Sequence, residues 1–273
     1  LLFEADCACT ALKTLLSMNY LVFWNDIRLF AGKNQRPTVV HQHPVIQLVV
    51  ATDGAFKTKV RDTENWVHKK GLLVKPNHLH QCDATNVDII SLEINPDTPL
   101  GAWILAEIFG EDQILEYPSE RFQQINPVLI HDFLRSGNWG QLHAYIREVF
   151  QFDSGSVPLA KDERIDSVLN YIHENISDKL STEQLIKVAF LSESRLLHLF
   201  KEQMGLPIRN YILWYRLKIA VEQITDGASV TEAAHRAGFS DQSHFTRNCL
   251  KMIGVPPSTI TKNSKFVQVS FSF

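Results

Sequence analysis

Residues 181–257 constrain the fold most, because one helix–turn–helix pattern is written there twice. The first copy covers residues 181–205 and the second covers residues 229–254. Each copy begins with a serine that can cap a short helix, and continues through a tight turn into a second amphipathic helix that ends at a glycine. Ser192 and Ser240, 48 residues apart, are expected to cap the two second helices. Paired helices of this kind place their second helix in the DNA major groove.

The second helix of each copy has an apolar face and a polar face. Leu196 and Phe245 fall on the expected inward faces. The outward and flanking residues are the candidate DNA contacts: Ser194, Arg195, Leu197, His198 and Lys201 in the first copy, and Gln242, Ser243, His244, Thr246 and Arg247 in the second. Arginine and histidine can donate to guanine, glutamine can pair with adenine, and leucine can meet a thymine methyl group. Lys201, at the helix end, is better placed for a phosphate.

A long apolar pattern over residues 209–225 predicts a helix that packs on both copies. At about 1.5 Å per residue it spans about 25 Å. With the width of the two units added, the second helices come about 34 Å apart, which is one turn of DNA. Residues 161–263 are therefore expected to form an all-α domain of two helix–turn–helix units joined by a long helix.

The charge balance fits this division. From Lys187 to the end, 11 Lys or Arg residues stand against 6 Asp or Glu, whereas residues 1–186 carry 16 against 24. A basic second part and an acidic first part suit a DNA-binding domain joined to a regulatory domain. Residues 153–160 are small, polar and end near a proline, and are expected to form the linker.

The part before the linker, residues 18–152, is expected to be a regulatory domain. The apolar stripe of its helices either packs on the β-strands or forms a dimer contact, and both interpretations stay open. Short Val-, Ile- and Leu-rich runs separated by turn residues predict a small β-barrel. After them, helical spacing predicts helices over residues 101–108, 112–117 and 128–150. The expected fold class is α+β, with an N-terminal cupin-like β-barrel, flanking helices and the C-terminal all-α domain.

Five of the eleven histidines lie between His41 and His80. His41 and His43 alternate along a strand, so their side chains project to the same face. With Gln47 and His80 they resemble the cupin motif, whose residues bind a divalent ion in cupin metalloenzymes. Gln47 stands where that motif has glutamate, and a neutral amide is a poorer ligand. The favoured interpretation is an effector pocket lined by these four residues, without metal or cofactor; a metal site on the three histidines is the alternative.

The segments LSESRLLHLFKEQMGLPIRNYILWYRLKIA and AGFSDQSHFTRNCLKMIGVPPS resemble the AraC/XylS family of bacterial transcription regulators over about 100 residues. The resemblance implies DNA binding by two adjacent units, effector sensing or dimerisation by the first domain, and activation through RNA polymerase. Cys249-Leu250 stands where the family has an aromatic residue and lysine, and Ser258-Thr259-Ile260 where it has Tyr-Arg. The second unit is therefore expected to bind more weakly, by about 1 kcal/mol.

The expected function is sequence-specific transcription regulation, as an activator that responds to a small-molecule effector and is not an enzyme. The alternative is a metal-dependent cupin enzyme with an appended DNA-binding module. Promoter DNA, RNA polymerase, a small effector and a second copy of the chain are the expected partners, in the cytoplasm and away from membranes. A methyl-accepting repair protein is disfavoured, because Cys249 fits a core position and Cys82 lacks the flanking residues of an activated thiol. Residues 1–17 are given no functional role, and residues 264–273 are expected to form a strand or an adherent tail.

Overall fold

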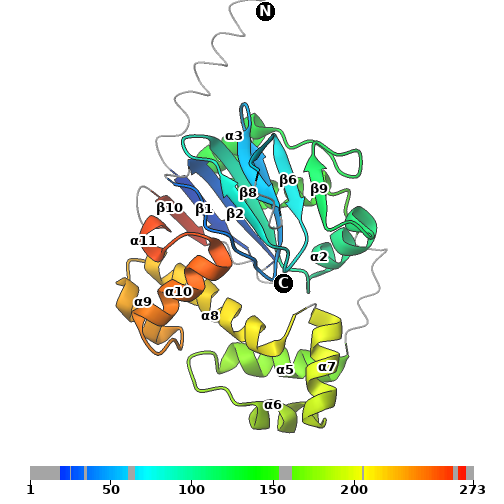
Figure 1. The fold of residues 1–273 in the computed structure, drawn as a ribbon, viewed down its shortest axis with the longest axis vertical. Coiled ribbons are helices and arrows are strands. Elements are labelled where there is room, and N and C mark those ends of the chain that lie inside the picture. The colour runs from blue at the N-terminus through cyan, green and yellow to red at the C-terminus, as the bar shows by residue number, and fades with distance from the viewer. Residues whose placement is uncertain are drawn as a thin grey trace, which may run out of the picture.

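The computed structural model describes residues 19–24, 26–33, 36–60, 65–153, 162–204, 206–260 and 264–268. The segment 1–17 and linker residues 154–160 lie outside these ranges. Residues 19–153, here called the sheet region, carry most of the strands, and residues 162–260, here called the helical region, lie beneath them in Figure 1. The linker boundaries stay a prediction.

The sheet region contains two sheets. Its strands are β1 (Asn19–Phe23), β2 (Ile27–Lys33), β3 (Ile46–Ala51), β4 (Phe56–Val60), β5 (Val67–Lys69), β6 (Gly71–Val74), β7 (His80–Asp83), β8 (Asp88–Ile94) and β9 (Ile114–Tyr117). Together with β10 (Ser264–Gln268), the larger sheet has the order β10-β1-β2-β8-β3-β6-β9, and the smaller has the order β5-β4-β7. The strands β3 and β8 are almost wholly buried at the centre of the larger sheet, as their continuous apolar sequences predict.

The mixed helix and sheet class is confirmed, whereas the cupin barrel is not. An isolated antiparallel bridge between His41 and His80 links the segment before β3 to the smaller sheet. Among the described strands, no continuous ladder closes the two sheets into a barrel. The sequence pattern of short strands and turns does not distinguish a closed barrel from two facing sheets, because both have the same alternation of inward and outward side chains.

Helices cover one side of the larger sheet. They are α2 (Pro99–Trp103), the π-helix η1 (Ile104–Phe109), α3 (Pro127–Ser136) and α4 (Trp139–Val149). Leu134, Leu142 and Ile146 are buried in the same core as the sheet, so the apolar stripe of α3 and α4 packs on the strands. The expected helix over residues 112–117 is wrong: residues 114–117 form β9 and pair with β6. Such a short apolar run fits either period, and the free edge of β6 decides for a strand.

The helical region follows the predicted order. Its helices are α5 (Glu163–Glu174), α6 (Thr182–Ala189), α7 (Glu193–Met204), α8 (Ile208–Thr225), α9 (Val230–Arg236), α10 (Gln242–Ile253) and α11 (Pro257–Ile260). One apolar core lies between α5, α6 and α7, and a second lies between α8, α9 and α10. Both cores include residues of α8, as expected for a connecting helix. Among the described helices, none has the length and apolar character that a bilayer span requires.

The helical region is docked on the sheet region at several places. The strand β10 pairs in parallel with β1 from Asn19↔Ser264 to Phe23↔Gln268, which confirms that part of the tail is a strand. Val45, just before β3, is buried in the apolar core of α8, α9 and α10. The backbone N–H of Val39 donates to the carbonyl of Gly254 at 2.9 Å. The end of α10 is therefore held against the segment that carries His41 and His43.

Candidate nucleic-acid interface and buried polar cluster

The capping pattern of the two helix–turn–helix copies is confirmed with one correction. Ser181 and Ser229 each form a capping box, with Gln184 and Glu232. Ser192 accepts from the backbone N–H of Arg195 at 3.4 Å, as expected of the cap of α7. In the second copy the cap of α10 is Asp241, which accepts from the N–H of His244 at 2.7 Å.

The expected cap Ser240 is therefore wrong by one residue. Its hydroxyl donates to Asp241 at 2.9 Å instead of capping the helix. The cap and the first inward residue are four positions apart in both copies, Ser192 with Leu196 and Asp241 with Phe245. A serine next to an aspartate makes the two positions hard to separate from sequence, because both residues are good N-caps.

The inward faces of α7 and α10 are buried as predicted. Leu196 and Phe200 in α7, and Phe245 in α10, are fully inaccessible to solvent. Cys249 is also fully buried, and burial raises the pKa of its thiol to about 12. Burial likewise raises the pKa of the Cys82 thiol to about 11. Both thiols are thus protonated at neutral pH, as expected of core residues and not of nucleophiles.

The outward residues of α7 are all exposed: Ser194, Arg195, Leu197, His198 and Lys201. In α10, Gln242, Ser243 and Arg247 are exposed, whereas His244 and Thr246 are half-buried. The ring of His244 packs edge-on against Phe239, with centroids 5.3 Å apart, and its Nδ1 lies 3.2 Å from the hydroxyl of Ser240. His244 therefore has contacts within its own unit, so Gln242, Ser243 and Arg247 form the open part of the second face.

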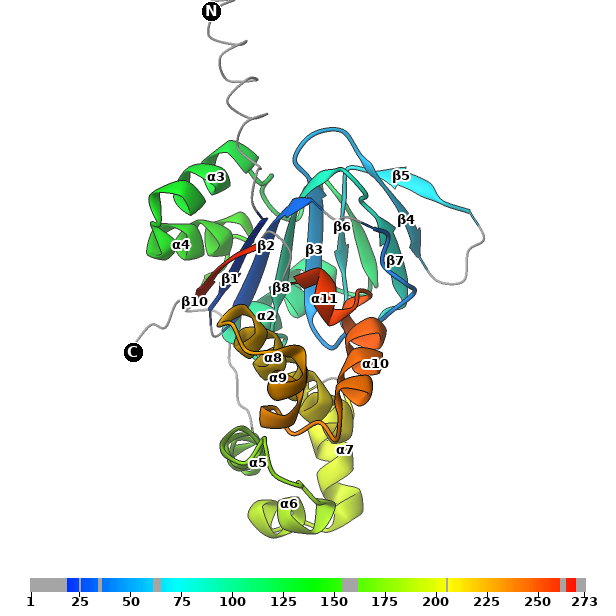
Figure 2. The same cartoon turned by 90° about the vertical axis from the view of Figure 1, so that its left-hand side faces the viewer.

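Figure 2 shows α7 and α10 toward the same side of the molecule, at different heights along its long axis. The helix α8 runs between the two units. This placement keeps both polar faces accessible, although the C-terminal end of α10 contacts the sheet region, where the N–H groups of Val39 and Gln42 donate to the carbonyls of Gly254 and Lys251. The assignment of individual DNA contacts stays a prediction.

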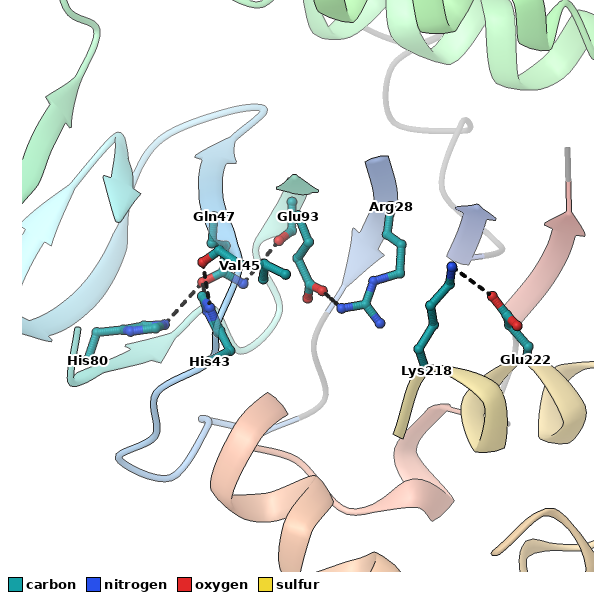
Figure 3. Close-up of polar contacts among 9 residues, drawn as sticks. Arg28, His43, Val45, Gln47, His80, Glu93, Lys218 and Glu222 are labelled. Atoms are coloured by element: carbon teal, nitrogen blue, oxygen red, sulfur yellow. Dashed lines mark hydrogen bonds and ion pairs between the residues drawn. The ribbon is translucent and has the colours of Figure 1, made fainter. Parts of the chain in front are cut away.

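The three predicted pocket histidines come together in a buried cluster. The ring centroids of His41 and His80 are 4.3 Å apart, and those of His43 and His80 are 4.9 Å apart. Gln47 Oε1 lies 3.2 Å from His43 Nε2 and 3.1 Å from His80 Nε2, as Figure 3 shows. Burial, assisted by repulsion between the neighbouring rings, lowers the pKa of His41 and His43 to about 4 and that of His80 to about 3. All three are therefore neutral at pH 7.

A cavity of about 160 Å³ lies between the larger sheet and the helical region. His41 and Gln47 line it, whereas His43 and His80 are not among its lining residues. Most of the lining is apolar and comes from β1, β2, β3 and β8 on one side and from Val221, Ile253, Val255 and Thr259 on the other. Of the four residues predicted to line an effector pocket, only His41 and Gln47 therefore line this cavity.

Charged residues surround this cavity. Arg28 and Lys33 reach it from β2, where Arg28 forms an ion pair with Glu93 and Lys33 lies 3.4 Å from Asp88. The guanidinium of Arg28 also lies 4.5 Å from the ring centroid of Trp214 in α8. Trp214 is thus a contact between the two regions.

A second ion pair lies on α8 itself. Figure 3 also shows Lys218 and Glu222, which are 3.9 Å apart. Burial lowers the pKa of Lys218 and raises that of Glu222, and each charge opposes the shift of the other. The sequence interpretation missed this partly buried ion pair, because it treated the connecting helix α8 only as an apolar packing element.

The sequence interpretation missed the contribution of β1, β2 and α8 to the cavity. The alternation in β2, where Arg28 and Phe30 share a face, was the available signal. It could not show which face the helical region covers, because that depends on contacts between residues about 190 positions apart.

Comparison with known proteins supports the same fold. A helix-turn-helix domain family matches residues 185–263. The probable transcriptional regulator LumQ of Photobacterium leiognathi is 35% identical over 115 residues, which are 41% of this chain and 44% of LumQ. The uncharacterized HTH-type transcriptional regulator YdeC of Bacillus subtilis is 20% identical over 252 residues, 82% of this chain and 86% of YdeC. The match thus spans less than half of LumQ.

Two crystal structures of ToxT from Vibrio cholerae share the fold over most of the chain. The apo form is 14% identical, covers 88% of this chain and 97% of ToxT, and has a TM-score of 0.54. The unsaturated fatty acid-bound form is 12% identical, covers 89% of this chain and 98% of ToxT, and has a TM-score of 0.52. At these identities the likeness shows the fold alone.

Two capped helix–turn–helix units on one connecting helix define the C-terminal part as a double helix-turn-helix domain. The matched helix-turn-helix domain, the regulator relatives and the shared fold together support the resemblance of this chain to the AraC/XylS family of transcription regulators.

Proposed function

We propose that this protein is a sequence-specific DNA-binding transcription regulator that places α7 and α10 in adjacent major grooves. The observation that carries the proposal is the pair of solvent-exposed polar helix faces held on one connecting helix, α8. Arg195 and Arg247, both exposed, are the proposed base contacts, and Lys201 is a proposed phosphate contact. Since the proposed partner is promoter DNA, the proposed location of the protein is the bacterial cytoplasm.

The cavity between the two regions is the proposed effector site. Its apolar lining and the half-exposed Lys33 suit a small molecule with an apolar body and one anionic group. The unsaturated fatty acid bound to ToxT, a protein of the same fold, belongs to that chemical class. Because the cavity is lined from both regions, a ligand there can alter how the helical region is held. Activation through RNA polymerase and formation of a homodimer belong to the same proposal.

DNA reading is tested by selection of binding sequences from a random duplex library with the purified chain. We expect enrichment of two half-sites whose centres are about 10 base pairs apart, because α7 and α10 are expected to lie one DNA turn from each other. Binding should weaken steeply as salt concentration rises. Recovery of sequences without any common element, at low and at moderate salt alike, would oppose the proposal.

Effector binding is tested by thermal unfolding with decanoate as the probe. At about 100 times its dissociation constant, decanoate is expected to stabilise the protein by about 2.7 kcal/mol, and so to raise the melting temperature. The variant Lys33→Gln should show a smaller rise, whereas the exposed Lys57→Gln should respond as wild type does. 1-Decanol has the same apolar chain without the anionic group, so it is the control ligand for the contribution of that group. No rise with decanoate would contradict the proposed ligand class.

A further inference from the structure

The three buried histidines have a shared hydrogen-bonding pattern. Nδ1 of His41 lies 2.9 Å from the carbonyl oxygen of Val39, Nδ1 of His43 lies 3.0 Å from that of Val45, and Nδ1 of His80 lies 2.9 Å from that of His78. A carbonyl oxygen is only an acceptor, so each Nδ1 must carry the proton and donate it.

Neutral imidazole carries one N–H, so the three Nε2 atoms are left with lone pairs. One ring nitrogen from each of His41, His43 and His80 lies within 4.8 Å of the other two. An N–H that donates to a backbone carbonyl, with the other nitrogen turned inward, is the arrangement that orients histidine for a metal ion. The fold therefore brings one ring nitrogen of each histidine into a single buried cluster, and for His43 and His80 the Nε2 atoms meet at Oε1 of Gln47.

Gln47 provides a second, independent observation. Its Oε1 faces Nε2 of both His43 and His80, at 3.2 and 3.1 Å, while its Nε2 donates to the hydroxyl of Ser91 at 3.3 Å. With Nδ1 protonated, this places an amide oxygen opposite two lone pairs, which repel it unless a cation lies among them.

Rotation of the Gln47 amide would also remove that repulsion, because its NH₂ group could then donate to both rings. After rotation, Nε2 of His41 still has no side-chain or backbone donor among the described residues; His41 lines the cavity, where a water can donate to it instead. A cation satisfies all three histidines and the amide oxygen together.

We propose that His41, His43 and His80, with Oε1 of Gln47, form a binding site for a divalent first-row transition-metal ion such as Zn²⁺ or Co²⁺. Imidazole nitrogens select such ions over Mg²⁺ and Ca²⁺, which prefer oxygen ligands, and thiolate ligands are absent from the four residues. Metal–nitrogen bonds of about 2.0–2.1 Å in a tetrahedral site place two ligand nitrogens about 3.3 Å apart, so metal binding requires the rings to close in from a spread of up to 4.8 Å. The sequence favoured a pocket without metal because Gln47 replaces a carboxylate; the convergence of the three rings reverses that preference.

The site lies against the helical region. The α10 end at Gly254 has a φ of +82°, and a Cβ there would be 2.7 Å from Nδ1 of His41 and from Cβ of Thr38. The ring of His43 lies 6.4 Å, centroid to centroid, from that of Trp214. A metal ion that fixes these histidines therefore also fixes the segment on which α10 is docked. Metal binding itself does not depend on the proposed DNA-binding function.

The test is a titration of the chelator-treated full chain with Co²⁺, followed by visible absorption, and with Zn²⁺ in competition with a chromophoric chelator. We expect one equivalent to bind and Zn²⁺ to raise the melting temperature. His80→Gln should weaken binding by at least about tenfold, since loss of even an outer-shell partner costs about 10–100-fold. The exposed His68→Ala is the matched control and should bind as wild type does.

Gln47→Glu is the second variant, and it keeps the test decisive if His80→Gln fails to fold. A carboxylate supplies a charged oxygen ligand in place of a neutral one, so we expect metal affinity to rise by about tenfold or more. Absence of saturable one-equivalent binding to wild type would overturn the proposal. So would equal affinities of wild type, His80→Gln and Gln47→Glu, because that result would assign the metal to surface histidines.

Discussion

Replacing Trp214 with alanine is expected to lower the free energy of unfolding by about 3–5 kcal/mol, as large-to-small substitution of a buried tryptophan does. Trp214 is only 5% exposed, packs in the core of α8, α9 and α10 with Val45, and lies 4.5 Å from the guanidinium of Arg28. The substitution therefore removes core volume and a cation–π contact at the same place. Urea unfolding, followed by circular dichroism, measures the loss.

Trp66→Ala is the matched control for this experiment. Trp66 is 37% exposed and contacts Lys59, whose ammonium lies 5.0 Å from the ring centroid. Its loss should cost about 0.5–1 kcal/mol, the usual cost of an exposed cation–π pair. Trp214→Phe should keep much of the stability, because a large ring still fills the site. Equal losses for Trp214→Ala and Trp66→Ala would show that the contact between the two regions is weak in solution.

The helix–turn–helix units were predictable because their signals are local. Serine caps, apolar positions at helical spacing and glycine ends act within a few residues of one another, and the structure confirms the order of helices from α6 to α10. The error at Ser240 is of the same local kind, since Asp241 is an equally good cap. The exposure of Arg195 and Arg247 follows directly from the helical period.

The relation between the two regions was not predictable. The pairing of β10 with β1 joins residues about 245 positions apart. The contact of Arg28 with Trp214 joins strand β2 to helix α8, and each of these elements can be predicted from its own sequence without any sign of the contact. The hydrophobic period of a strand or helix shows which of its faces is apolar, but it does not show which other element packs against that face. The expected strand through His41 and His43 is wrong, because β3 begins only at Ile46 and His41 forms just an isolated bridge with His80. The two side chains do cluster, but the approach of His80 through that bridge could not be predicted from strand alternation.

Replacement of the two proposed base-reading arginines should have the largest effect on DNA binding. Arg195→Ala and Arg247→Ala are each expected to weaken binding to a selected duplex by about 1–3 kcal/mol, because a bidentate arginine–guanine contact is worth that much against a wrong base. The two residues lie on separate helices, α7 and α10, so the losses in the double variant should be nearly additive. Lys57→Ala, in β4, controls for the loss of one positive charge.

The most direct measurement is the affinity of wild type, Arg195→Ala, Arg247→Ala and Lys57→Ala for the selected duplex and for duplexes mutated in one half-site. We expect Arg195→Ala to lose discrimination at one half-site and Arg247→Ala at the other, while Lys57→Ala keeps both. Unchanged affinity and unchanged discrimination in both arginine variants would contradict base reading by α7 and α10.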